Sequence, residues 1–81
     1  MRPATIQSIL DELKPKCTQT DEQMVPIATA MVRLLQEHGV NDESEYSALI
    51  HLNQSIPAGT PKMDCQSIAA DYVTLREGAN T

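Results

Sequence analysis

The sequence predicts an all-α protein, folded as a compact bundle of four short helices. Apolar residues recur at three- and four-residue spacing through most of the chain, which is the period of one buried helix face. No stretch alternates apolar and polar residues in the manner of a half-buried strand. Prolines and glycines separate the periodic stretches, so the expected helices span residues 3–14, 20–38, 42–55 and 61–76.

The length of 81 residues predicts a single domain over residues 1–81, with residues 78–81 as a short tail. The first helix begins at Pro3, because a missing N–H costs nothing in a first helical turn. It ends before Pro15, since the residue preceding a proline resists the helical conformation. Its apolar stripe consists of Ile6, Ile9, Leu10 and Leu13.

The second helix has the longest apolar stripe and is therefore expected to be the central helix of the bundle. Thr20 is its expected N-cap, and Gln23 completes a capping box. Gly39 ends the helix, with Val40 packing back on Leu35 as in a Schellman ending. The buried face is expected to contain Met24, Ile27, Ala28, Met31, Leu34 and Leu35.

Pro26 leaves two readings of this helix open. Proline lacks the N–H that would bond to the Glu22 carbonyl. Either a single helix is kinked at Pro26, or residues 21–25 form a separate turn and the regular helix begins near Pro26. The apolar register continues through the proline, which favours one kinked helix.

The third helix is expected to begin at Asn41 or Asp42, where Asp42 and Glu45 have the spacing of a capping arrangement. Its buried side is expected to contain Tyr46, Leu49, Ile50, Leu52 and Ile56.

The fourth helix is expected to begin at Thr60 and Pro61, which give the signal of a cap followed by a first-turn proline. Gly78 ends it. Its expected stripe is Cys65, Ile68, Ala69, Tyr72 and Leu75.

Two cysteines, Cys17 and Cys65, can form one disulfide. The chain has neither a secretory hydrophobic region nor a dense cysteine framework, so reduced thiols and a cytoplasmic location are expected. Cys65 then acts as a small apolar residue of the fourth helix. No stretch approaches the roughly 18 consecutive apolar residues of a membrane span, so no membrane partner is expected.

No residue pattern indicates catalytic, metal or cofactor chemistry. Neither the two cysteines nor His38 and His51 stand at metal-ligand spacing. His51 has mostly polar helical neighbours and is expected to face water. Serines and threonines occur at caps and on polar faces, and no glycine-rich loop is present. We therefore expect a protein without enzymatic activity, metal or cofactor.

The net charge of −5, with scattered basic residues, disfavours nucleic acid as a partner. The alternative function is a small DNA-binding transcriptional regulator that uses the second and third helices as a helix-turn-helix. Its recognition helix would open with Asp42, Glu43 and Glu45, which would repel phosphates.

Acidic residues cluster at the junction of the second and third helices. Glu37, Asp42, Glu43 and Glu45 flank this junction, and Tyr46 follows it. Helix N-termini favour acids, which explains most of the cluster. The functional interpretation is a docking patch for a basic protein surface, with Tyr46 as its anchor. The sequence thus predicts a regulator, inhibitor or adaptor that binds another protein. A homodimer is a further expectation, because a core without Phe or Trp buries little area.

Overall fold

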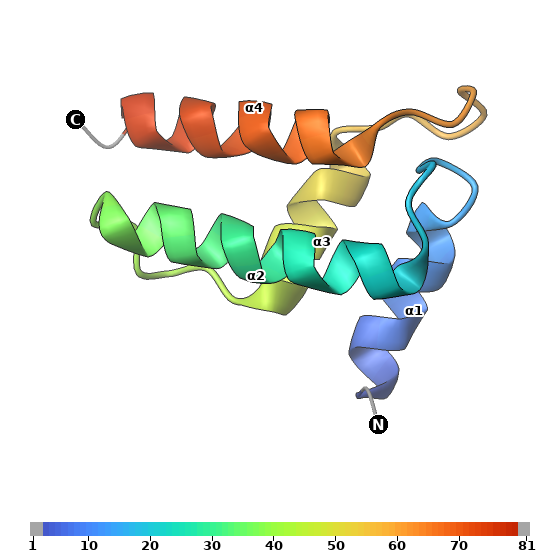
Figure 1. The fold of residues 1–81 in the computed structure, drawn as a ribbon, viewed down its shortest axis with the longest axis horizontal. Helices are drawn as coiled ribbons and strands as arrows, with labels where there is room; N and C mark the ends of the chain where they lie inside the picture. Colours follow the sequence, from blue (N-terminus) through green and yellow to red (C-terminus); the bar gives the residue numbers. More distant parts are fainter. Residues whose placement is uncertain (1–2, 80–81) are drawn as a thin grey trace.

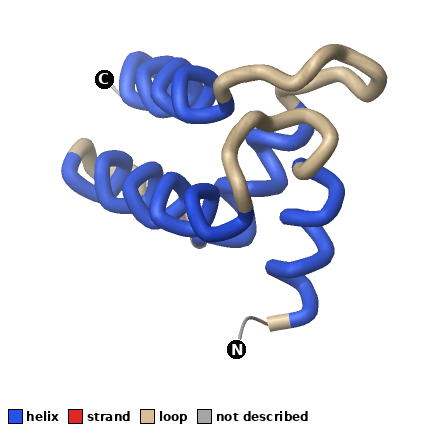
Figure 2. Tube along the Cα trace, turned by 45° about the vertical axis from the view of Figure 1, so that its right-hand side comes forward, coloured by secondary structure: helices blue, strands red, loops and turns tan. Residues whose placement is uncertain are grey.

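The computed structural model describes residues 3–79 and confirms the all-α fold (Figure 1). The helices are α1 (Ala4–Leu13), α2 (Asp21–Glu37), α3 (Glu45–Gln54) and α4 (Cys65–Ala79). Helices α2 and α4 lie side by side and run in the same direction (Figures 1 and 2). Helix α1 lies at the end of the bundle where α2 and α4 begin. None of the helices described here has the length and apolar character needed to span a membrane.

The core takes residues from every helix, and α3 rather than α2 is its centre. Helix α3 packs against each of the other three helices. Helix α2 packs against α3 and α4 and leaves its outer face exposed. Its long apolar stripe therefore does not place it at the centre of the bundle, where the sequence predicted it. The buried residues of the helices are Ile9, Leu10, Leu13, Met24, Ala28, Met31, Leu35, Ala48, Leu49, Leu52, Cys65, Ala69 and Val73.

Both ends of α2 form as the sequence predicts. The N–H of Thr20 donates to Oε1 of Gln23 at 2.9 Å, which is one half of the capping box. At the other end Gly39 has a φ of +84°, and the N–H of Val40 donates to the Leu35 carbonyl at 2.8 Å. This is the Schellman ending. The helix continues without interruption through Pro26, so no separate turn precedes it; a bend at Pro26 stays a prediction.

Helix α3 begins later than predicted. Its N-cap is Ser44, not Asn41 or Asp42. The Ser44 N–H donates to Oγ of Ser47 at 2.9 Å, and the Ser47 N–H donates to Oγ of Ser44 at 3.1 Å. The Asp42 carboxylate instead lies 3.1 Å from Arg76 of α4.

Helix α4 begins at Cys65 instead of residue 61. The preceding segment is extended and pairs with the chain after α1: the Thr18 N–H donates to the Met63 carbonyl, and the Met63 N–H donates to the Lys16 carbonyl, both at 2.9 Å. Asp64 accepts the Gln66 N–H at 3.1 Å and so caps the helix. Non-local pairing therefore overrides the signal of Thr60 and Pro61.

The far end of α4 also differs from the prediction. The helix includes Gly78 and continues to Ala79, past the predicted end at residue 76. The predicted tail is therefore helical at residues 78–79, and its residues 80–81 lie outside the described part of the chain. Leu75 was expected in the core but is 73 % exposed. Cys65, Ala69 and Val73 form the buried line instead, at four-residue spacing.

Cys17 and Cys65 form a disulfide, with their Cα atoms 5.4 Å apart. Both residues are buried. The expectation of reduced thiols, with Cys65 as a free apolar residue, is therefore wrong. Disulfides persist mainly in oxidising compartments, so this bond weighs against the predicted cytoplasmic location.

Candidate functional site

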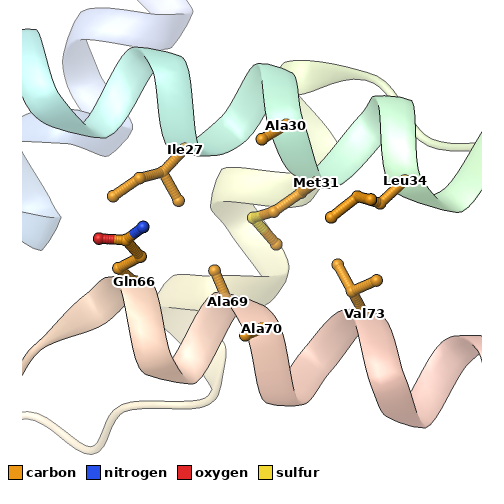
Figure 3. Close-up of a pocket in the computed structure, with 8 residues that line it drawn as sticks. All are labelled: Ile27, Ala30, Met31, Leu34, Gln66, Ala69, Ala70 and Val73. Atoms are coloured by element: carbon orange, nitrogen blue, oxygen red, sulfur yellow. The ribbon is translucent and has the colours of Figure 1, made fainter.

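An apolar groove, here called the α2–α4 groove, lies between α2 and α4 (Figure 3). Its volume is about 140 Å³. Gln66 is its single polar lining residue. The apolar lining residues are Ile27, Ala30, Met31 and Leu34 from α2, and Ala69, Ala70 and Val73 from α4.

The groove exists because small side chains face one another where the two helices lie side by side. Ala30, Ala69 and Ala70 cannot fill the space between the helices (Figure 3). Leu34 was expected in the buried stripe, but it is 43 % exposed and lies along the groove. Met31 is buried and closes the floor towards α3.

Polar bridges connect α2 and α4 at both ends of the groove. At one end the Gln19 amide donates to Asp64 at 2.6 Å and accepts the Cys65 N–H at 3.1 Å. The hydrogen bond from Gln19 is the main reason that the pKa of Asp64 lies below its usual value. At the other end Nε2 of His38 lies 3.3 Å from Oε1 of Glu77. These contacts connect the chain at both ends of the groove and restrict the separation of α2 and α4.

Glu43 is the centre of a second feature, the Glu43 cluster, which comprises Glu43, Ser47, His51, Tyr72 and Arg76. Its carboxylate accepts hydrogen bonds from the hydroxyls of Ser47 and Tyr72. Arg76 Nη1 donates to the same carboxylate at 2.6 Å, and His51 Nδ1 lies 3.2 Å from it. The Glu43 side chain is only 2 % exposed. The cluster thus joins the loop before α3 to the last turns of α4.

The surroundings of Glu43 favour its charged form. Burial alone would raise the pKa of the carboxyl group, because it disfavours a charge. The hydrogen bonds from Ser47 and Tyr72, with the nearby His51 and Arg76, outweigh burial and lower the pKa. Burial and the hydrogen bond to Glu43 raise the pKa of Tyr72, so its hydroxyl keeps its proton.

Comparisons with protein-family models, with curated proteins and with solved structures find no match for the chain. Function is therefore inferred from geometry. Among the described residues, every buried side-chain nitrogen and oxygen has a hydrogen-bond partner, which includes those of the Glu43 cluster. The groove instead presents unpartnered apolar surface.

The structure separates the residues that the sequence assigned to an acidic docking patch. Glu43 is withdrawn into its cluster, and Asp42 is paired with Arg76. Glu45 accepts a hydrogen bond from Thr29 at 3.2 Å. Glu37 remains exposed at the end of α2, and Tyr46 is 42 % exposed on α3. Docking through this junction stays a prediction, with Glu37 its most accessible acid.

The sequence pattern did not indicate the roles of three members of the Glu43 cluster, namely His51, Tyr72 and Arg76. His51 was expected to face water, but it is half-buried and its ring lies 5.5 Å from that of Tyr72. Tyr72 was assigned to the apolar stripe, and Arg76 was given no role. Tyr72 and Arg76 are four residues apart and therefore lie on one face of α4, which is the only sign of their contact that the sequence contains. No sequence pattern near these residues indicates that this face contacts Glu43. Within residues 3–79, no three metal-ligating side chains gather.

Proposed function

We propose that this protein acts by binding another protein, and that the α2–α4 groove is the binding surface. The observation that supports this proposal is the exposed apolar lining, with Leu34 43 % exposed beside it. Water gains access to apolar atoms that the fold does not cover, and covering them with a partner is favourable by about 25 cal/mol per Å². Apolar patches larger than roughly a few hundred Å² mark interaction sites; this groove is smaller and suits a short apolar segment of a partner.

The shape of the groove suits a helix. It follows α2 from Ile27 to Leu34, which is two turns or about 10 Å. Ala30 and Ala70 permit the close approach of another backbone. A partner helix would place apolar side chains at positions i, i+3 or i+4, and i+7 into such a groove. The restricted separation of α2 and α4 reduces the ordering cost of binding.

A catalytic role for the Glu43 cluster has less support. Tyrosine, histidine and glutamate side chains meet there beside an arginine, and the first three can take part in acid–base chemistry. The groups are bonded to one another, and the carboxylate at their centre is only 2 % exposed. This arrangement favours a structural role, so the proposal is a regulator, inhibitor or adaptor without enzymatic activity. No observation favours the DNA-binding alternative.

The proposal is tested with two matched variants, Leu34→Gln and Leu75→Gln. Both leucines are exposed on helices, but only Leu34 lines the groove. Tagged wild type and variants are purified from the source cells, and bound proteins are quantified by mass spectrometry. Leu34→Gln is expected to lose a partner that Leu75→Gln retains. Equal recovery of all partners by the two variants would contradict the proposal.

A further inference from the structure

Resting on the proposed function, we propose that the occupant of the α2–α4 groove is an amphipathic helix with Lys or Arg at its N-terminal end. This helix lies antiparallel to α2 and α4. The charges at the two ends of the groove differ in a way that helix capping does not explain.

The first observation is an accumulation of negative charge where α2 and α4 end. The two helices run in the same direction, so their C-terminal ends lie at one end of the groove (Figure 1). The helix dipole gives each C-terminal end the equivalent of about −0.5 of an elementary charge. Glu37 ends α2, and Glu77 lies in the last turn of α4. A carboxylate at this position is unfavourable.

The second observation is that the chain supplies little positive charge there. The last turn of α2 contains no basic residue. Arg76 of α4 is turned away to Glu43, at 2.6 Å, and to Asp42, at 3.1 Å. His38 contacts Glu77 and offsets its charge only when protonated. A cation from a partner would relieve this repulsion.

The opposite end of the groove is balanced by the helix dipole. Asp21 and Glu22 occupy the first turn of α2, where the dipole is positive and acids are stabilising. A partner helix therefore gains most by placing its positive end beside Glu37 and Glu77. Its own N-terminus carries about +0.5 of an elementary charge, and Lys or Arg nearby adds to the attraction. The antiparallel orientation follows.

The same charges disfavour a second copy of this chain as the occupant. A second α2 lying antiparallel in the groove would bring its Asp21 and Glu22 to Glu37 and Glu77. Each copy also has a net charge of −5. Like charges brought together oppose association. The groove thus fits a basic helix better than it fits a copy of itself.

The test uses two synthetic peptides of about 16 residues, near the minimum length for appreciable helicity. Both have the same composition and one Leu face; one has two Arg residues at its N-terminus, and the other has them at its C-terminus. Affinity is measured by fluorescence anisotropy, and the site by methyl NMR of Ile27, Leu34 and Val73. We expect the peptide with N-terminal arginines to shift these methyl signals and to bind about ten-fold more tightly at low salt, with the preference declining as salt rises.

The matched variants are Glu37→Lys and Glu12→Lys, which make the same charge change at two exposed helical positions. Glu37→Lys should remove the preference between the peptides, and Glu12→Lys on α1 should retain it. Equal affinity of the two peptides, no binding of either, or methyl shifts outside the groove would overturn the inference. Light scattering that shows a dimer lost in Leu34→Gln would also overturn it. These outcomes leave the proposed function to be decided by the purification experiment with Leu34→Gln and Leu75→Gln.

Discussion

At the scale of single residues, Glu43 is the residue whose environment differs most from the one that the sequence predicted. The acidic cluster predicted an exposed carboxylate, and the structure contains a buried one with four partners. Buried charges are tolerated when their hydrogen bonds are complete. Removing such a carboxylate leaves its former donors without an acceptor. The loss of stability is therefore larger than when an exposed acid is removed.

We predict that Glu43→Ala lowers the free energy of unfolding by about 1–3 kcal/mol, because Tyr72 and Arg76 lose their shared acceptor. The control is Glu45→Ala, two residues away and exposed, which should change stability by about 0.5 kcal/mol or less. Urea denaturation followed by circular dichroism measures both. Equal losses in the two variants would show that the Glu43 cluster does not hold the fold together.

The lowered pKa of Glu43 predicts a dependence of stability on pH. The unfolded carboxyl group takes up a proton near its usual value of 4.5, whereas the folded one does so only at lower pH. The stabilisation is therefore complete above that usual value and is lost as pH falls through the folded pKa. Urea denaturation of wild type and Glu43→Gln at several pH values below 7 measures this. The stability difference between the two proteins should shrink in acid; a constant difference would contradict the assignment.

At the scale of secondary-structure elements, helix ends follow either local or distant signals. The end of α2 is local: Gly39 adopts a positive φ, and the chain turns back so that Val40 meets Leu35. The start of α4 depends on a distant signal: Met63 pairs with residues 16–18 before α2, and the helix begins only at Cys65. A sequence pattern reports the first kind of boundary and is silent about the second.

We predict opposite effects for two glycine-to-alanine substitutions. Gly39→Ala should lower the free energy of unfolding by about 1 kcal/mol, because alanine is strained at a φ of +84°. Gly78→Ala should raise it by up to about 1 kcal/mol, because Gly78 is helical and an added Cβ meets nothing within 4 Å. Thermal denaturation compares them. A stabilising Gly39→Ala would show that the turn relaxes to a different conformation.

At the scale of the whole molecule, the Cys17–Cys65 disulfide supplements a small core. It connects the loop after α1 to the start of α4, across 48 residues of sequence. The buried apolar residues are aliphatic or sulfur-containing, since the chain has no Phe or Trp. A core of this size typically yields only about 3–5 kcal/mol net. A cross-link that restricts the unfolded chain is then a large fraction of the total stability.

We predict that the Cys17→Ala and Cys65→Ala double variant is less stable than wild type by about 4 kcal/mol, the chain-entropy value for a loop of 48 residues. Thermal denaturation with and without a reducing agent gives an independent measurement. The reducing agent should destabilise wild type and leave the double variant unchanged. If reduction leaves the melting temperature of wild type unaltered, the disulfide does not support the fold.

The sequence by itself determined which segments are helical and how α2 begins and ends, because apolar period and capping involve residues within a few positions of one another. The tertiary structure alone decided the disulfide, the Glu43 cluster, the central place of α3 and the α2–α4 groove. Each of these brings together residues far apart in the chain, such as Cys17 with Cys65, Glu43 with Arg76, and Ala30 with Ala70. Such meetings depend on how the helices pack, and helix packing is a property of the whole chain that no local pattern contains.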